Sequence, residues 1–167
     1  MSPRAAWRLE SLGFSQVYEY VAGKADWLAF GLPSEGHDAN TQRVGQIARR
    51  DVPTCALHER VPEVRDRVET AGWDECLVVN DRQVVLGRLH GASLEVPADT
   101  TAEEAMEPGP TTTRPDEPLI RIGPRLRDKH VGRIIVTTPD GRLVGIAERR
   151  TAERALRERH DTEDDHD

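Results

Sequence analysis

The sequence of 167 residues is long enough for one ordinary domain, or for a compact domain with a fragment of another. Its formal charge of -7 is concentrated in residues 158–167, where six acids and one base give -5, so the body of the chain is almost neutral. This near-neutral body has no run of about eighteen apolar residues and no signal-peptide core, which indicates a cytoplasmic protein that binds neither nucleic acid nor membrane.

Residues 1–36 are predicted to form a helix, a strand and a second helix. Ser2 suits the N-cap of the first helix, Pro3 fits its first turn, and Gly13 ends it. The patterns Gly-Phe-x-x-Val and Gly-x-x-x-Trp-x-x-x-Gly-Leu-Pro follow within residues 13–33.

These patterns resemble the C-terminal end of a rhodanese-like domain, although Ala22 stands where that family usually has a second glycine. The catalytic cysteine of that family lies in a loop just before the first of these helices. Neither Cys55 nor Cys76 occupies that place. The resemblance therefore implies a remnant without catalytic activity.

Aromatic residues are concentrated in this first segment, because six of the seven in the chain lie within the first thirty positions. A segment shorter than about 40 residues rarely buries such rings by itself. We therefore expect either that the remnant docks on the rest of the chain or on another chain, or that it is marginally stable and exposes an adhesive apolar surface. Residues 37–51 are polar and are predicted to be a linker. Alternatively, Thr41 caps a short helix with Val44, Ile47 and Ala48 on one side.

An internal repeat organises the rest of the chain. The segment LVVNDRQVVLG at residues 77–87 aligns with IVTTPDGRLVG at residues 135–145, an offset of 58 positions. The same offset relates two apolar trios, each spaced three and then four residues apart, which define one face of a helix. The trios are Val61, Val64 and Val68 in the first repeat and Leu119, Ile122 and Leu126 in the second.

Each repeat is predicted to contain an extended lead-in, a helix, two strands joined by a tight turn, and a closing helix. The first unit is expected at about residues 52–98 and the second at about 106–157, followed by an acidic, disordered tail at 158–167. No metal site is predicted, because Cys55 and Cys76 lack the spacing of a redox pair or a zinc site and are expected to be structural thiols.

The linker EEAMEPGPTTTRPDEPL at residues 103–119 and the stretch DGRLVGIAERRTAE at residues 140–153 resemble those of tandem cystathionine-β-synthase-type (CBS) domains. The resemblance covers residues 51–156. It implies an α+β fold in which two βαββα units pack sheet to sheet as a pseudo-twofold pair. It also implies an adenosine derivative bound between the units, and a homodimer.

In this family, the last strand of each unit ends with Thr or Ser, and an Asp three residues later helps to hold the ribose hydroxyls. The matching positions here are His90 and Ser93 in the first unit, and Glu148 and Thr151 in the second. Neither unit keeps the pattern. A serine or threonine offers one hydroxyl, which binds more weakly than a carboxylate, so the resemblance implies a weakened site.

Other residues could complete such a site. The base is expected beside the short entry segments of the two units, formed by Thr54 and Cys55 in one unit and Thr112 and Thr113 in the other. Glu148 could replace the missing carboxylate. The phosphate could meet Arg133, Arg149 or Arg150, although residues 148–150 equally fit a solvated first turn of the last helix.

Three functions remain open from the sequence. The first is a regulatory module that binds AMP, ADP, ATP or S-adenosylmethionine. The second is a ligand-free scaffold for dimerisation or docking. It is favoured by the replacement of the residues that hold the ribose in the family. The third is a truncated form of a rhodanese–CBS sulfurtransferase whose cysteine loop lies upstream of Met1.

Overall fold

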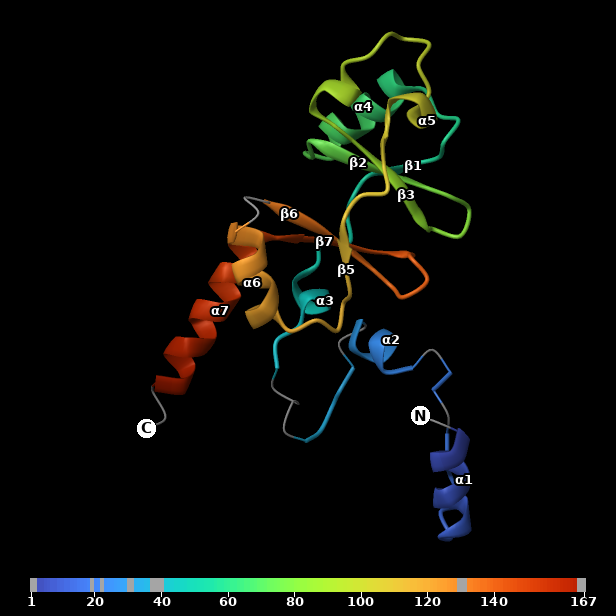
Figure 1. The fold of residues 1–167 in the computed structure, drawn as a ribbon, viewed down its shortest axis with the longest axis vertical. Coiled ribbons are helices and arrows are strands. Elements are labelled where there is room, and N and C mark those ends of the chain that lie inside the picture. Colours follow the sequence, from blue (N-terminus) through green and yellow to red (C-terminus); the bar gives the residue numbers. More distant parts are fainter. Residues whose placement is uncertain are drawn as a thin grey trace.

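The computed structural model describes residues 3–18, 20–21, 23–29, 32–36, 41–128 and 132–164. Two small sheets of order β1-β2-β3-β4 and β5-β6-β7 form the body, each covered by helices (Figure 1). The first sheet contains β1 (Thr54–Cys55), β2 (Glu75–Val79), β3 (Val85–His90) and β4 (Glu107–Pro108), with α4 (Val61–Thr70), η1 (Gly91–Leu94) and α5 (Ala102–Ala105) beside it. The second contains β5 (Thr112–Thr113), β6 (Arg133–Thr137) and β7 (Leu143–Glu148), with α3 (Val44–Ile47), α6 (Leu119–Asp128) and α7 (Arg149–Asp164).

The main helix of each unit is amphipathic, as the apolar trios predict. Val61, Val64 and Val68 of α4 are buried beneath the first sheet, and Leu119 and Ile122 of α6 are buried in the second unit. Burying a valine or leucine side chain stabilises the fold by about 1.5–3 kcal/mol. Leu126, the last residue of the second trio, lies outside the side chains that the structure describes.

The strand register repeats at the predicted offset of 58. Thr54 of β1 pairs with Leu77, and Thr112 of β5 pairs with Ile135, both in parallel. The antiparallel hairpins pair Glu75 with His90 and Arg133 with Glu148, and each hairpin has an irregularity at the corresponding step, after Val78 and after Val136. The two βαββα halves and their α+β class are therefore confirmed.

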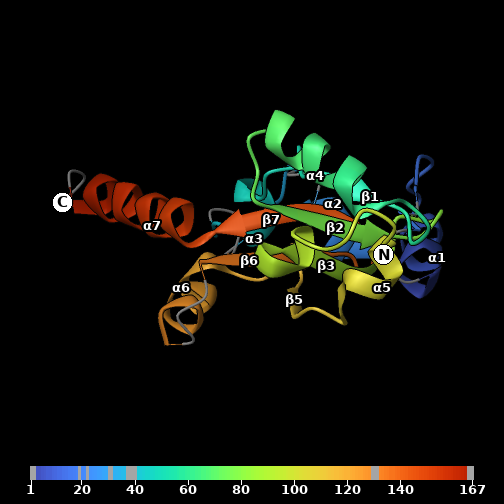
Figure 2. The ribbon, with the colours of Figure 1, turned by 90° about the horizontal axis from the view of Figure 1, so that it is seen from above.

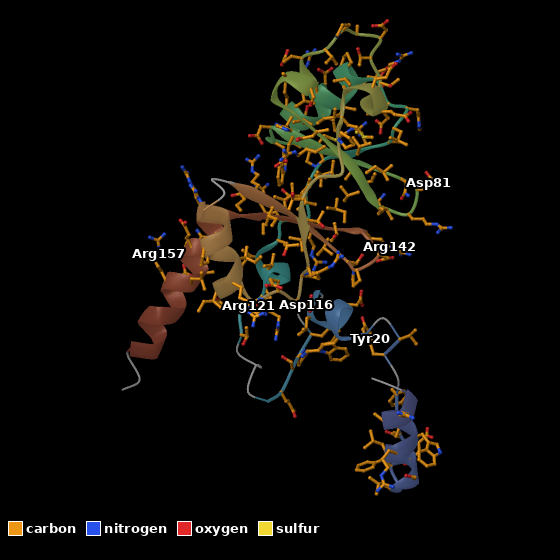
Figure 3. All side chains as sticks on the ribbon, viewed as in Figure 1. Tyr20, Asp81, Asp116, Arg121, Arg142 and Arg157 are labelled. Atoms are coloured by element: carbon orange, nitrogen blue, oxygen red, sulfur yellow. The ribbon has the colours of Figure 1, made fainter. Side chains whose placement is uncertain are left out.

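The sheets pack against each other, and the hairpin turns join across the boundary. Ile135 and Ile146 of the second sheet belong to the apolar core of the first unit. At the turns, the Val85 N–H donates to the Gly141 carbonyl at 3.0 Å, and the Leu143 N–H donates to the Gln83 carbonyl at 2.8 Å. The turns, marked by Asp81 and Arg142 in Figure 3, lie on the same side of the molecule.

Each unit is completed by the lead-in segment of the other. We define the lead-in segments as residues 42–51, which precede β1, and residues 100–109, which precede β5. Helix α3 of the first segment packs in the core of the second unit, with Val44 fully buried against Leu119 and Ile122. Helix α5 of the second segment packs in the core of the first unit, where Ala102 is fully buried.

The backbone contacts of the lead-in segments also follow the offset. The Val44 N–H donates to the Glu117 carbonyl at 3.0 Å, and the Ala102 N–H donates to the Glu59 carbonyl at 2.9 Å. Arg49 pairs with Ile146 of β7, as Glu107 pairs with Arg88 of β3. Residues 42–51, expected to be part of a linker, are thus an ordered element of the repeat, because their apolar side chains fill the opposite unit.

The N-terminal segment has two helices, α1 (Pro3–Ser11) and α2 (Gly23–Ala29). The strand predicted between them is wrong for residues 14–18, 20 and 21, which have no strand partner to satisfy their backbone groups. Helix α2 lies against α3, and Tyr20 contacts Trp27 edge to face at 5.2 Å between ring centroids. Helix α1 stands apart from the body (Figure 1), and Trp7 is 68% exposed.

The last helix extends further than expected. Helix α7 continues to Asp164, through most of the segment for which the sequence predicts disorder, and it projects from the body (Figure 2). Once a helix is nucleated, each added residue gains a hydrogen bond, and Arg154 pairs with Glu158 one turn later at 3.8 Å. No helix in the described ranges is long and apolar enough to cross a membrane.

Candidate functional site

A cleft of about 740 Å³ lies where the two units meet. Its walls come from the start of β2 and the end of β3 in the first unit, and from the start of β6, the end of β7 and the first turn of α7 in the second. Several of its residues are related by the offset of 58, so the cleft straddles the approximate dyad. It is lined by Asp74, Glu75, Arg88, His90, Gly91, Gly132, Arg133, Glu148, Arg149 and Arg150.

Arg133 is the central charge of this cleft. Its Nη1 lies 3.1 Å from Glu75 Oε1 and also contacts Asp74, while its Nε lies 3.8 Å from Glu148 Oε1. The Glu75 side chain is only 6% exposed, so Arg133 supplies the charge that its carboxylate needs. Burial works against the charge of Arg133, but the carboxylates of Asp74 and Glu75 outweigh it and raise the pKa of Arg133.

Trp73 lies beneath these charges at the edge of the first unit. Its ring is buried, with the Arg49 guanidinium carbon 4.2 Å and the Arg133 guanidinium carbon 5.7 Å from the ring centre. A guanidinium within about 6 Å of an indole ring is attracted to its face. Trp73 of the first unit is thus held between a residue of its own lead-in segment and a residue of the second unit.

The ion pairs on the two sides of the dyad have opposite polarity. Arg49 of one lead-in segment lies 3.7 Å from Glu148. At the equivalent positions of the other half, Glu107 lies 3.1 Å from His90. Glu107 also binds Arg88 at 2.8 Å, and hydrogen bonds from Arg88 and then His90 hold the pKa of Glu107 below its usual value of 4.5. Acid and base have therefore exchanged places between the repeats.

The structure brings five of the predicted site residues into the cleft. These are His90, Arg133, Glu148, Arg149 and Arg150. Ser93 is engaged locally, because its hydroxyl accepts from the His90 N–H at 2.7 Å and donates to the His90 carbonyl at 3.0 Å. Thr151 lines an adjoining hollow instead.

The predicted base-pocket residues do not line this cleft. Cys55 and Thr113 are 3% and 8% exposed, Thr54 is half-buried and Thr112 is exposed on the short strand β5. The Thr54 carbonyl accepts a hydrogen bond from Arg67 at 2.6 Å. These four residues stay a prediction as contacts for a base.

Sequence reasoning missed Asp74, Glu75 and Arg88 among the cleft residues. The predicted site residues came from the ends of the last strands and from the short strands β1 and β5, whereas Asp74 and Glu75 lie at the start of β2. The repeat itself could have indicated these residues, since the offset of 58 aligns the acid Glu75 with the base Arg133 in the sequence. Opposite charges at equivalent positions can meet across a dyad.

The two cysteines are free and buried, as expected for structural thiols. A hydrogen bond to Cys55, followed by burial, raises the pKa of the Cys76 thiol, so it stays protonated. Both lie in the apolar core of the first unit. Among the residues the structure describes, no group of three or more His, Cys, Asp or Glu side chains is arranged to hold a metal.

Comparisons with known proteins bear on the fold of this pair. The CBS domain family model matches residues 102–158. The cytosolic domain of the Mg²⁺ channel MgtE, solved with ATP, has a TM-score of 0.62 at 20% identity, and the alignment covers 70% of this chain and 50% of that one. No curated protein matches the chain.

Two further solved structures are similar along nearly their whole length. The CBS-pair protein CBSX2 from Arabidopsis thaliana, in complex with AMP, has a TM-score of 0.61 at 19% identity, covering 70% of this chain and 96% of that one. The CBS domain pair of MJ0100, in complex with 5′-methylthioadenosine and S-adenosyl-L-methionine, has a TM-score of 0.60 at 16% identity, covering 71% and 98%. The second repeat of this chain thus matches the CBS domain family, and the two repeats together have the fold of a CBS-domain pair.

Proposed function

We propose that this chain is a regulatory module that binds an adenine nucleotide, or a related ligand, between its two units. The observation that carries the proposal is the dyad cleft, to which both units contribute charged side chains at equivalent positions. The similar structures named above hold ATP, AMP, or methylthioadenosine with S-adenosyl-L-methionine, which supports an adenosine ligand here.

The second unit offers the better anchors in this proposal. Ser93 already satisfies its hydroxyl within its own turn, whereas Glu148 faces the cleft and Thr151 lies three residues beyond it. A carboxylate that accepts from ribose hydroxyls forms charge-assisted bonds. Arg133 and Arg149 are the groups proposed to meet the phosphate.

Binding at this place would couple the ligand to the arrangement of the units. Arg133 of the second unit contacts Asp74 and Glu75 of the first. A phosphate that draws the Arg133 guanidinium toward itself competes with those carboxylates. The position of Arg133 over Trp73 then changes, which makes the tryptophan fluorescence of the chain a reporter of binding.

Thermal unfolding with AMP, ADP, ATP and S-adenosylmethionine tests the proposal. A ligand at 100 times its Kd adds about 2.7 kcal/mol to the free energy of unfolding, which raises Tm by several degrees. Glu148→Gln should reduce that shift, while Glu63→Gln, at an exposed position of α4 outside the cleft, should not. A Tm that none of the four ligands moves would contradict the proposal.

A ligand-free scaffold is the second candidate, and the ion pairs that Arg133 already makes inside the cleft favour it. Arg133 is already neutralised by carboxylates, and the usual ribose anchors are replaced. In this version the pair acts through homodimerisation or docking, and light scattering should show a dimer whose mass no nucleotide changes. Glu148→Ala and Thr151→Ala should then leave the dimer unaltered.

The N-terminal segment is proposed to serve a larger assembly. Trp7, Phe14 and Tyr18 are 68%, 60% and 78% exposed, and such rings normally become buried against other protein surface. We propose residues 1–36 as a rhodanese-like remnant, and a sulfurtransferase would require a cysteine loop ahead of α1. The intact mass of the native protein tests the sulfurtransferase proposal, which requires a mass larger than that expected for 167 residues.

A further inference from the structure

A second hollow adjoins the dyad cleft along helix α7. It has a volume of about 660 Å³ and shares Glu148 and Arg150 with the cleft, so the two hollows lie side by side. The other residues that line it are Thr151, Glu153, Arg154 and Arg157.

Three arginines of this hollow lie on one face of α7. Arg150, Arg154 and Arg157 are spaced four and then three residues apart, the spacing that places side chains in a row on a helix. All three are exposed, and Arg157 points outward from the helix in Figure 3. The row begins at the mouth of the cleft and leads away from it.

The acids in and beside this hollow compete little with a bound anion. Glu148 faces Arg49 at 3.7 Å and Arg133 at 3.8 Å, and Glu153 faces Arg149 at 3.9 Å. Glu158 pairs with Arg154 at 3.8 Å, but both side chains are 70% exposed, and such pairs are weak in water. A chain with a net charge of -7 thus has a locally positive hollow next to its cleft.

We propose that this hollow receives the outer phosphates of a nucleotide whose nucleoside lies in the cleft. The inference rests on the proposed function and names its ligand class, a nucleoside di- or triphosphate. Guanidinium groups bind phosphate oxygens through paired, charge-assisted hydrogen bonds. A nucleoside monophosphate does not reach this row, and S-adenosylmethionine, with its sulfonium and ammonium groups, gains nothing from it.

A longer polyanion fits this surface less well than a short phosphate chain. Beyond Arg157 the sequence of the same helix contains one arginine and four acids, Arg159 with Glu158, Asp161, Glu163 and Asp164, a net charge of -3. A nucleic-acid backbone or an acidic peptide that continued along α7 would meet this negative segment. The charge distribution therefore favours a ligand that ends within the hollow.

Calorimetric titration of the full chain with AMP, ADP, ATP and S-adenosylmethionine, without divalent cations, tests the inference. ATP should bind about tenfold more tightly than AMP, and that advantage should shrink with added salt. In the variant R154Q/R157Q, ATP should lose about tenfold in affinity and AMP less than twofold. The control R65Q/R82Q removes two arginines outside both hollows and should bind ATP as the native chain does.

The outcomes separate this inference from the proposed function. Equal affinities for AMP and ATP, or an equal loss of ATP binding in the control variant, would overturn the inference and leave an adenine-nucleotide module in place. If none of the four ligands binds, both fail. Circular dichroism of each variant confirms that a lost affinity reflects the missing arginines, because all four substituted side chains lie on the surface.

Discussion

The two units of this chain share one backbone plan but differ in the chemistry placed on it. Strand register, sheet irregularity, turn contacts and reciprocal lead-in segments all recur at an offset of 58. The charges do not recur at this offset. Glu75 is equivalent to Arg133, which it also contacts, and His90 is equivalent to Glu148. A twofold pair with identical charges would bring like charges together at its dyad, and exchanging them turns that repulsion into attraction. The repeat therefore preserves the packing of the two units, whereas the residues of the cleft diverge.

The closing elements differ in the same way. The first unit ends in the short η1, whereas the second ends in the 16-residue α7. Leu94 and Ala152 occupy equivalent positions and are both buried, so the inward contact is kept. Only the second unit carries a long helix beyond that contact, and it is there that the row of arginines lies.

Removing one lead-in segment should produce the largest effect. Deleting residues 1–40 leaves α3 in place and should leave a cooperative unfolding transition. Deleting residues 1–51 exposes the core of the second unit and should cost about 7 kcal/mol, combining about 1.5–3 for Val44 with about 1 for each of five lost backbone hydrogen bonds. That loss approaches the whole stability of an ordinary domain. The lost bonds join Gln42 to Leu119, Val44 to Glu117 and Gly45 to Pro115, and two more join Arg49 to Ile146.

Thermal unfolding followed by circular dichroism measures the two deletions. If both truncated chains unfolded at the same temperature, the segment 42–51 would be a mere linker and the reciprocal arrangement would be wrong. The comparison is internally matched, because the shorter deletion already removes the N-terminal helices.

Two equivalent glycines should respond differently to the same substitution. A Cβ at Gly145 would lie 2.2 Å from the carbonyl oxygen of Arg49, which is backbone held in the strand pairing. A Cβ at Gly87 would lie 2.4 Å from Met106 Sδ, the flexible end of a side chain that can move away. We expect Gly145→Ala to cost about 3 kcal/mol and Gly87→Ala about 1 kcal/mol, within the usual range for overpacking.

Urea unfolding of both variants gives these free energies. A larger loss for Gly87→Ala would mean that the lead-in strand of the first repeat yields more easily than Met106. The tight backbone pairing described for Arg49 would then have to be revised.

The sequence predicted the elements that the two repeats share and missed the ones whose residues diverged. The apolar helix faces, the hairpins and Gly87 with Gly145 align by eye at the offset of 58. The lead-in segments RVGQIARRD and TAEEAMEPG share no residue at equivalent positions, and only small or apolar character is kept, at the pairs Val44 and Ala102, Ile47 and Ala105, and Ala48 and Met106. A linker was therefore the natural interpretation of residues 37–51.

The site could be predicted where it follows the ends of strands, as for His90 and Glu148. It could not where two units must first be brought together, since the contact of Arg133 with Asp74 and Glu75 depends on the dyad and not on local sequence. The predicted N-terminal strand failed for a related reason. A strand needs a partner, and sequence pattern alone does not supply one.

The hairpin turns should differ by a smaller amount. Gln83 has φ of 62°, in the left-handed region where the equivalent Gly141 has φ of 83°. A side chain in that region costs about 1 kcal/mol relative to glycine. Gln83→Gly should therefore raise the free energy of unfolding by roughly 0.5–1 kcal/mol, offset in part by the greater entropy of the unfolded chain. Urea denaturation tests it, and a lower stability would show that the Gln83 side chain makes contacts that outweigh its strain.

The smallest expected effect concerns the exposed ion pairs at Glu107. Hydrogen bonds from Arg88 and then His90 lower its pKa from 4.5, so the pairing stabilises the fold above that pH and the contribution disappears as the pH falls through the lowered value. Carbon-detected NMR titration should place the Glu107 carboxyl below 4.5 in the native chain and closer to 4.5 in Arg88→Gln. Substituting Arg82, which is exposed on the turn of the same hairpin, should leave the titration unchanged. If Arg88→Gln left it unchanged as well, Arg88 would not be what holds the carboxylate charged, and the reversed polarity of the two halves would rest on His90 alone.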